Sequence, residues 1–339
     1  MSRSFFIPIL PGLALSAAVA AAAYIAELVQ IRLFGQRWID GLVFAIVIGT
    51  LIHTACGMHA RLIPGIDFAA KFVLEVAVVL LGASIGFAAI RDAGLGLLAV
   101  VAGVVICSLG VSYGLGRMVG LSDRLATLVA CGNSICGNSA IVAAAPVIDA
   151  DSEDVAASIA FSAALGIIVV LLLPLLPPLS GMDERHYGIL AGMTVYAVPQ
   201  VFAATVPVGI VSTQIGALVK LMRVLMLGPV ILALGMKNNR NSTDRLAIAR
   251  LVPWFIIGFL GMVILNAVGL IPQSAIAPIH ATSTALTIVS MAALGLSVNI
   301  RMVMSSGGRV LMAGGLSIIA LAIISLAAIY GVLPILTSA

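Results

Sequence analysis

Residues 131–139 read Cys-Gly-Asn-Ser-Ile-Cys-Gly-Asn-Ser, so the tetrad Cys-Gly-Asn-Ser occurs twice, five residues apart. The repeat lies near the middle of an otherwise apolar stretch at residues 122–149. Asn, Ser and Gly are poor helix formers, and Asn and Ser side chains compete for backbone hydrogen bonds. Bare backbone groups in hydrocarbon cost several kcal/mol each, so an unwound segment persists in a membrane only where it faces protein or water. The stretch therefore predicts a helix that is broken at its centre.

The composition of the chain identifies its solvent as lipid. Of the 339 residues, 62% are hydrophobic and only 9% are charged, whereas soluble domains carry about 25% charged residues. The mean hydropathy is +1.24. Apolar runs of about 20 residues recur along the chain, and each is long enough to cross a hydrocarbon core of ~30 Å. The sequence predicts an all-α, polytopic membrane protein.

The apolar runs give about eleven candidate transmembrane helices. They lie at residues 9–30, 42–59, 69–90, 94–116, 122–149, 154–178, 188–205, 208–236, 250–270, 280–300 and 308–334. The segments between them are short, and no linker or soluble domain interrupts the series. We therefore expect residues 1–339 to form a single transmembrane domain.

The cations in the loops predict the orientation of the chain. With eleven crossings, the side of the N-terminus carries Arg3, Arg61, Arg117, Arg124, Arg185, Lys237, Arg240, Arg245, Arg250, Arg301 and Arg309. The opposite side carries only Arg32, Arg37 and Arg91. Because cytoplasmic loops are enriched in Lys and Arg, we expect a cytoplasmic N-terminus and an external C-terminus. The acidic stretch at 149–154 would then lie outside.

A weak internal similarity joins Gly82–Leu98 to Gly295–Leu311. The two segments belong to candidate helices that would cross the bilayer in opposite directions. Such inverted repeats are common in secondary transporters. The alternative is that two glycine-containing apolar helices resemble each other without common architecture.

The doubled tetrad is the leading candidate for a substrate site. A broken helix presents N–H groups at the start of one half and carbonyl groups at the end of the other, which is how transporters hold solutes at the bilayer midplane. The alternative is a polar helix interface built from small residues. The candidate binding residues in this segment are Gly132, Asn133, Ser134, Gly137, Asn138 and Ser139.

Two cations lie inside the candidate helix at 208–236. Lys220 and Arg223 are three residues apart and share one helical face. Lys220 would lie about 20 Å from the start of this helix. An intramembrane cation indicates a functional site, and its counter-charge would be Glu75 or an anionic substrate. The alternative is that both side chains snorkel to the interface. Gln200, which follows Pro199, adds a polar group where the helix at 188–205 is expected to kink.

Lys71 and Glu75 are four residues apart at the start of the helix at 69–90. An exposed interfacial ion pair is the first interpretation. Glu75 lies one turn deeper and is the alternative candidate for a proton carrier, because a carboxyl group in low dielectric titrates closer to neutral pH.

Several classes of function have no support in the sequence. The four cysteines lie in apolar runs without metal-ligand spacing, and no His/carboxylate metal cluster is present. Residues 82–86 match the pattern GxSxG, but they lie within a helix, where this spacing is typical of helix packing and not of a hydrolase elbow. The basic residues are loop signals, so a nucleic-acid partner is not expected. We expect no enzyme activity, no metal and no cofactor.

The sequence resembles a family of bacterial inner-membrane proteins, the sulfate exporter (PSE) family. The resemblance is carried by residues 132–141, 220–224, 253–259 and 291–296 and spans nearly the whole chain. It implies about eleven helices, location in the inner membrane and secondary transport of an anion. The family is also similar to transporter folds with crossed broken helices and elevator-like motion.

One departure from the family pattern concerns proton coupling. The family carries a His-Glu pair in the seventh helix, where this chain has Tyr196 and Ala197. Proton coupling through such a pair is therefore not implied for this chain.

Together these observations predict a secondary active transporter of a small anion, sulfate or an organic sulfonate, that works by alternating access. Asn133, Ser134, Asn138 and Ser139 would hold the substrate, and Lys220 and Arg223 would supply compensating charge. The alternatives are a Na⁺- or H⁺-coupled transporter of another solute, an anion channel, or an intramembrane enzyme that uses Ser84. A homodimer is left open.

Overall fold

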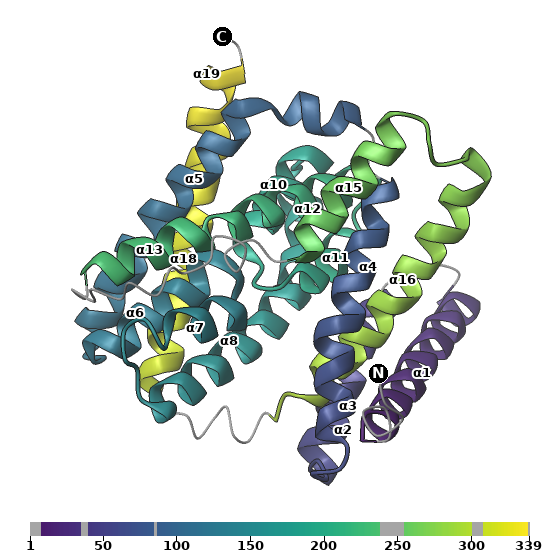
Figure 1. Ribbon diagram of the computed structural model, residues 1–339, viewed down its shortest axis with the longest axis horizontal. Helices are drawn as coiled ribbons and strands as arrows, with labels where there is room; N and C mark the ends of the chain where they lie inside the picture. The colour runs from purple at the N-terminus through teal and green to yellow at the C-terminus, as the bar shows by residue number, and fades with distance from the viewer. Residues whose placement is uncertain (1–7, 35–39, 85–86, 238–253, 300–307, 338–339) are drawn as a thin grey trace. The chain divides into compact units, whose positions relative to one another are not determined.

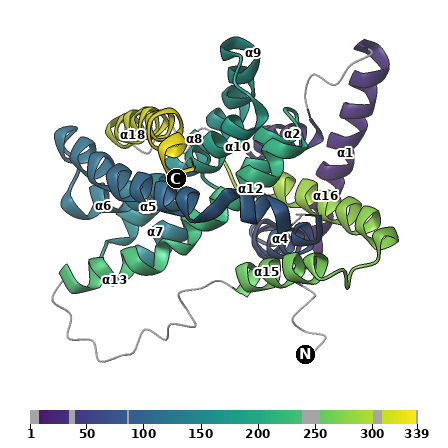
Figure 2. The same ribbon diagram turned by 90° about the horizontal axis from the view of Figure 1, so that it is seen from above.

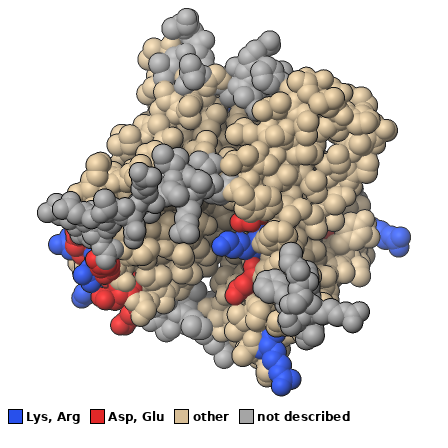
Figure 3. Space-filling view, in the orientation of Figure 1, with Lys and Arg blue, Asp and Glu red and all other residues tan. Residues whose placement is uncertain are grey.

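The computed structural model describes residues 8–34, 40–84, 87–237, 254–299 and 308–337, and every regular element in these ranges is a helix (Figure 1). Charged side chains are sparse on the face in Figure 3. Six helical segments are long and apolar enough to cross a membrane: Leu10–Leu33, Gly96–Met118, Ser152–Ser180, Ile210–Met236, Gln273–Leu296 and Gly308–Ile335. The shorter apolar helices are Gly41–Cys56 and Trp254–Ala267. These segments confirm the prediction of an all-helical, polytopic membrane protein.

The chain divides into two compact units. Unit 1 consists of Met1–Phe87 and Trp254–Arg301, and unit 2 consists of Ala88–Pro253 and Met302–Ala339. Each unit is described by itself below.

Unit 1 is built around the close packing of its longer helices. In it, a Cβ atom on Gly49 would lie 2.6 Å from the Ala292 carbonyl oxygen, and one on Gly295 would lie 2.3 Å from the Ile46 carbonyl oxygen. Glycine is therefore required where α2 and α16 cross, because any side chain would separate the two backbones. The helices of unit 1 are α1 (Leu10–Phe34), α2 (Gly41–Cys56), α3 (Ile63–Phe68), η1 (Ala69–Val73), α4 (Leu74–Leu81), η2 (Gly82–Ser84), α15 (Trp254–Ala267) and α16 (Gln273–Leu296).

Unit 2 contains both interrupted segments that the sequence singled out. Its helices are α5 (Phe87–Met118), α6 (Asp123–Cys131), η3 (Gly132–Cys136), α7 (Asn138–Ala144), α8 (Ser152–Leu172), η4 (Leu173–Leu175), α9 (Leu176–Ser180), α10 (Glu184–Thr194), α11 (Val198–Thr205), α12 (Ile210–Leu225), α13 (Leu227–Lys237), α18 (Gly308–Ala327), η5 (Ala328–Val332) and α19 (Leu333–Thr337).

The first interrupted segment, α6–η3–α7, folds back on itself, and we call it hairpin 1. The π-helix η3 ends at Gly137, whose φ of 67° ends the helical path. A Cβ atom on Gly132 would lie 3.0 Å from the Ile141 side chain, so the two arms run side by side. The two ends of hairpin 1 meet, because Arg124 forms an ion pair with Asp151 at 3.5 Å.

The second interrupted segment, α10–α11, is hairpin 2. Helix α10 ends where Val195 and Ala197 become extended, and Pro199 is compatible with the first turn of α11. The arms are again adjacent, because the Tyr187 hydroxyl donates to the Ala204 carbonyl oxygen at 2.8 Å. The ends also meet, because the Val211 amide at the start of α12 donates to Glu184 at 3.1 Å.

This path corrects the prediction that the segments at 122–149 and 188–205 cross the membrane. Helices of 9 residues (α6) and 7 residues (α7) are each shorter than about half of a hydrocarbon core. Hydropathy reports the apolar length of a segment and not its direction, so it cannot distinguish a hairpin from a crossing helix. Asp151 consequently lies on the same side as Arg124, and not on the opposite side as the count of eleven crossings required.

The two hairpins enter unit 2 from opposite ends. The continuous segment Ser152–Ser180, 29 residues long, leads from the end of hairpin 1 to the start of hairpin 2. Each hairpin is followed by a long helix, α8 after the first and α12 after the second. This is an inverted arrangement. The repeat predicted between Gly82–Leu98 and Gly295–Leu311 lies partly outside the described residues and stays a prediction.

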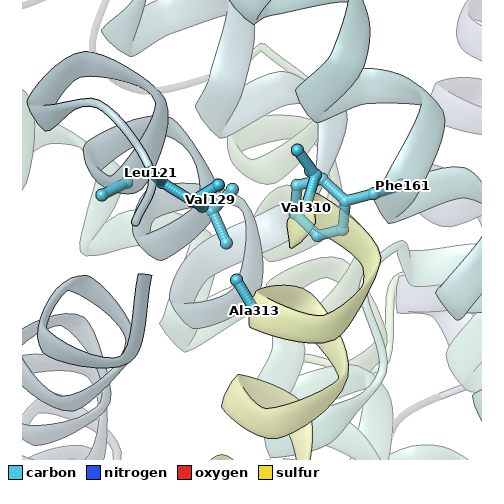
Figure 4. Packing of buried hydrophobic residues seen from close by; sticks show 6 residues of the cluster. Leu121, Val129, Phe161, Val310 and Ala313 are labelled. Atoms are coloured by element: carbon cyan, nitrogen blue, oxygen red, sulfur yellow. The ribbon is translucent and has the colours of Figure 1, made fainter. Parts of the chain in front are cut away.

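Hairpin 1 is anchored by an apolar cluster. Phe161 of α8 lies between α6 and α18, and it is fully buried with Val129 and Ala313 (Figure 4). Leu121, Ala126 and Val310 complete the cluster. Hairpin 1 is thus held between α8 and α18.

Cysteine labelling from the two faces of the membrane tests the hairpin path. With the native cysteines replaced, Arg124→Cys and Asp151→Cys are expected to react with a membrane-impermeant maleimide from the same face, and Glu184→Cys from the opposite face. Loss of the exposed Arg124–Asp151 pair costs at most about 1 kcal/mol, so these variants are expected to fold. Labelling of positions 124 and 151 from opposite faces would show that the segment crosses the bilayer.

Candidate functional site: the tips of the two hairpins

Helix α12 carries the two buried cations of the candidate site. Lys220 is 0% exposed and Arg223 is 1% exposed. They share one face of α12, about 15 and 20 Å along the helix from its first residue, Ile210. Neither side chain snorkels out of the protein, so the snorkelling interpretation is wrong.

Lys220 contacts the tips of both hairpins. Its ammonium group donates to the Ile135 carbonyl oxygen of hairpin 1 and to the Val195 carbonyl oxygen of hairpin 2, each at 2.8 Å. Both acceptors lie where the first arm of a hairpin ends. One side chain therefore joins two chain breaks that are 60 residues apart in the sequence.

Arg223 also donates hydrogen bonds to both hairpins, through its planar guanidinium group. In hairpin 1, its Nε donates to the Ser134 carbonyl oxygen at 3.2 Å and its Nη2 to the Asn133 carbonyl oxygen at 2.8 Å. In hairpin 2, its Nη1 donates to the carbonyl oxygens of Gly192 at 3.0 Å and Val195 at 3.2 Å. The fixed geometry of guanidinium allows this simultaneous contact with several carbonyl groups.

These contacts compensate the partial negative charge at the tips of the hairpins. The end of a helix carries unpaired carbonyl groups and a partial negative charge. The recorded hydrogen bonds of Lys220 and Arg223 all go to such carbonyl oxygens, and among the described residues no acidic side chain pairs with either cation. The C-terminal ends of the two first arms are therefore compensated by two full positive charges.

The returning arm of each hairpin begins with a helix N-terminus, which carries a partial positive charge. Both of these N-termini lie beside α8. Helix α7 begins at Asn138, whose side-chain oxygen accepts a hydrogen bond from Ser162 of α8. Helix α11 begins at Val198, and the Gln200 side-chain oxygen accepts from the Ala197 amide at 3.1 Å. The side-chain oxygens of Asn138 and Gln200 therefore each accept a hydrogen bond. In the described residues, the Asn138 Nδ2 and the Gln200 Nε2 donate to no protein acceptor.

Helix α8 brings the two amides together. Ser162 contacts Asn138, and Gly166, one turn further along α8, lies against Gln200, because a Cβ atom on Gly166 would come within 2.6 Å of the Gln200 Nε2. The positive ends of α7 and α11 thus lie beside adjacent turns of one helix. This arrangement presents neutral hydrogen-bond donors together with two helix N-termini, which favour negative charge.

Substitution of Gly166 tests this contact. Gly166→Ala is expected to displace the Gln200 side chain and to remove the cap of α11, which costs about 1 kcal/mol. Hydrogen–deuterium exchange of the first turn of α11 should accelerate. Gly114→Ala is the control, because a Cβ atom at Gly114 meets no atom within 4 Å. Equal exchange in the two variants would show that Gly166 does not position Gln200.

Tyr196 links the hairpin tips directly. Its hydroxyl group donates to the Asn133 side-chain oxygen, and the Asn133 amide nitrogen donates to the Gly314 carbonyl oxygen of α18 at 3.3 Å. Tyr196 and Asn133 are 2% and 1% exposed. Asn133 therefore has a structural contact in this conformation, and its side chain is not presented to a ligand.

The other predicted residues of the doubled tetrad differ in accessibility. Ser134 is fully buried, and its hydroxyl has no hydrogen-bond partner among the described residues. Gly132 and Gly137 shape the tip, whereas Asn138 is half-buried and Ser139 is exposed. Asn138 and Ser139 are the members of this set that a solute can reach.

Lys71 and Glu75 belong to unit 1, not to the unit of the hairpins. Lys71 is exposed in η1, and Glu75 accepts a hydrogen bond from the Trp254 indole at 2.7 Å. No ion pair joins Lys71 to Glu75 in the described ranges. The first interpretation of this pair is therefore wrong, and a coupling role for Glu75 stays a prediction.

Sequence reasoning missed Ser162 and Gly166 of α8. Both are ordinary small residues in an apolar helix, so no motif distinguishes them. Their spacing of four residues was the one available signal, because it places them on one helical face. The described residues also contain no group of three or more His, Cys, Asp or Glu side chains placed to hold a metal ion.

Comparison with known proteins assigns most of the chain to one family. Residues 11–314 match the model of the family described as Conserved hypothetical protein 698. A UPF0324 membrane protein of Brucella melitensis is 56% identical over 323 residues, which cover 95% of this chain and 90% of that protein. A UPF0324 membrane protein of Agrobacterium fabrum is 52% identical over 318 residues, covering 94% and 92% of the two chains.

The similarity extends to relatives of lower identity. A UPF0324 membrane protein of Bacillus cereus is 34% identical over 313 residues, covering 91% of each chain. The matches span both compact units and both hairpins. The chain therefore belongs to the Conserved hypothetical protein 698 family, whose relatives here are UPF0324 membrane proteins.

Proposed function

We propose that this protein is a secondary active transporter of a small anion, sulfate or an organic sulfonate, and that the anion binds where α7 and α11 begin. The observation that carries the proposal is the separation of charge at the hairpin tips. Lys220 and Arg223 neutralise the negative helix ends, and the positive ends of α7 and α11 are left beside α8.

The binding groups in this proposal are neutral donors. Asn138 Nδ2, the Ser139 hydroxyl and the first backbone amides of α7 would donate to the substrate oxygens. Gln200 Nε2 is 2% exposed in this conformation and would join them when alternating access opens the site. Lys220 and Arg223 act as positioning residues that hold the tips together and bias the local potential. Their donors are directed to backbone carbonyl oxygens, so they differ from the direct anion ligands that the sequence predicted.

A transporter of cations is the second candidate, because exposed carbonyl groups at helix breaks can coordinate Na⁺. The carbonyl oxygens of Asn133, Ser134, Ile135, Gly192 and Val195 are already occupied by Lys220 and Arg223. A further cation there would also be repelled by two fixed charges. This arrangement favours the anion.

Re-entrant hairpins favour coupled transport over a channel. The tips of the two short hairpins meet within unit 2, where Lys220 donates to both of them, and interrupted helices of this kind are typical of secondary transporters. The coupling ion would be H⁺ or Na⁺, with Glu75 and Lys71 as candidates in unit 1. We propose no enzymatic activity.

The proposed location is the bacterial inner membrane with a cytoplasmic N-terminus. If the two hairpin segments are removed from the eleven candidate crossings, an odd number remains, so the two chain ends stay on the sides that eleven crossings would give them. Arg185, in hairpin 2, moves to the outside, and the segment 149–154 moves to the cytoplasmic side. Ten loop cations then lie inside and four outside, which still agrees with the positive-inside rule.

A thermal-shift screen of the purified protein tests the substrate class. A ligand present at 100 times its Kd stabilises the folded state by about 2.7 kcal/mol. We expect sulfate or small sulfonates to raise the unfolding temperature at constant ionic strength, and choline or Na⁺ salts of non-binding anions to have no effect. Stabilisation by Na⁺ with every anion would favour the cation transporter.

A further inference from the structure

A cavity in unit 2 is separate from the hairpin tips. It has a volume of about 510 Å³ and is lined by residues of α5, α6 and α13. Figure 2 shows these three helices in the same part of unit 2. Its walls are apolar except for the hydroxyls of Tyr113 and Thr127 and the thiol of Cys131. The lining includes Val105 and Tyr113 of α5, Thr127 and Cys131 of α6, Met226, and Leu234 of α13.

The position of this cavity determines what can fill it. Two of its walls come from the segments Gly96–Met118 and Ile210–Met236, which are long and apolar enough to span the membrane. Ile106, on its edge, is 68% exposed. The cavity therefore opens toward hydrocarbon, and its apolar lining excludes ordered water because water needs several polar partners.

The cavity has an apolar end and a polar end. Cys131 and Met226 lie at the level of the hairpin tip, and Tyr113 and Leu234 lie towards the foot of hairpin 1. The α5 wall from Val105 to Tyr113 is about 12 Å long, which matches an extended stretch of acyl chain. One acidic and one basic side chain lie beyond Tyr113. Asp123 accepts a hydrogen bond from the Tyr113 hydroxyl. Arg117, one turn beyond Tyr113, donates to the Leu121 carbonyl oxygen at 2.8 Å.

We propose that this cavity binds one phospholipid, with an acyl chain between α5, α6 and α13 and a zwitterionic ammonium headgroup at Arg117 and Asp123. The opposite charges of Arg117 and Asp123 are the reason for proposing a zwitterionic headgroup. The phosphate is adjacent to the guanidinium of Arg117, and the primary ammonium is adjacent to the carboxylate of Asp123. The lipid contacts the first arm of hairpin 1 through Thr127, Ala130 and Cys131 and supports that arm against α13.

Filling the cavity tests the proposal. A Cβ atom on Gly110 meets no atom within 4 Å, so Gly110→Leu places its side chain in the cavity without a backbone clash. Gly103→Leu is the matched control, because Gly103 lies on the same helix in open space and does not line the cavity. Ala233→Leu fills the cavity from the opposite wall and serves as a second variant.

Native mass spectrometry of protein extracted in mild detergent supplies the readout. Wild type and Gly103→Leu are expected to retain one phosphatidylethanolamine per chain, whereas Gly110→Leu and Ala233→Leu should bind it about tenfold more weakly, equivalent to about 1.4 kcal/mol. After exchange into nanodiscs of defined composition, phosphatidylethanolamine should be retained in preference to phosphatidylglycerol and phosphatidylcholine. Equal lipid retention by Gly110→Leu, Ala233→Leu and Gly103→Leu would overturn the site, and preferential retention of phosphatidylglycerol would overturn the headgroup assignment.

Discussion

Replacement of Arg223 by methionine is expected to destabilise unit 2 strongly and to abolish transport. Methionine has a similar length but no donors, so the carbonyl oxygens of Asn133, Ser134 and Gly192 lose a buried charged partner. Each buried carbonyl oxygen left without a partner costs about 1–3 kcal/mol, so the loss of several contacts is expected to cost about 3 kcal/mol or more. The unfolding temperature in detergent should fall accordingly, and Arg223→Lys should be intermediate, because it keeps the charge and loses the fork.

Arg124→Met is the matched control for Arg223→Met. The Arg124 side chain is 48% exposed and pairs with Asp151 at the surface. Such a pair contributes about 0–1 kcal/mol, so the variant should unfold close to wild type. Equal unfolding temperatures for Arg223→Met and wild type would show that the buried cation does not hold the hairpins together.

Asn138→Asp is expected to weaken anion binding by about 100-fold or more, because a like charge beside a bound anion costs several kcal/mol. The substitution preserves the shape of the side chain and replaces the free amide donor with a carboxylate. Asn138→Ala removes the donor without adding charge and should weaken binding only about two- to tenfold, the effect of losing one hydrogen bond of about 0.5–1.5 kcal/mol. Equilibrium binding of labelled sulfate measures both effects.

The relative affinities of these two variants distinguish an anion site from a cation site. At a cation site, Asn138→Asp would strengthen binding and Asn138→Ala would weaken it. Gln273→Glu is the control for added charge, because Gln273 is exposed at the start of α16 in unit 1. Sulfate binding that is unchanged in Asn138→Asp would exclude Asn138 from the site.

The sequence was sufficient to locate the chain breaks but not to determine their direction. Gly137 and the polar residues around it predicted the interruption of 122–149, and Pro199 predicted that of 188–205. The return of each segment depends on contacts between distant residues, such as Tyr187 with Ala204 and Arg124 with Asp151. These pairs have no signature in local hydropathy, because a hairpin and a crossing helix have the same apolar composition.

The candidate site was predicted in part for a similar reason. Lys220 and Arg223 were conspicuous because cations are rare in apolar helices. Their partners are backbone carbonyl oxygens, which every residue possesses, so the sequence could not indicate that these donors are directed to the hairpins and not to a substrate. Gly166 and Ser162 were missed because their importance comes from their position opposite Gln200 and Asn138.

Counterflow of labelled sulfate in proteoliposomes tests the central claim most directly. Vesicles loaded with unlabelled sulfate and containing the wild-type protein should accumulate labelled sulfate transiently, and vesicles containing Asn138→Asp should not. A coupled carrier requires this exchange, because one binding site faces each side in turn. Absence of counterflow for every sulfate and sulfonate tested, with folded protein in the vesicles, would contradict the account.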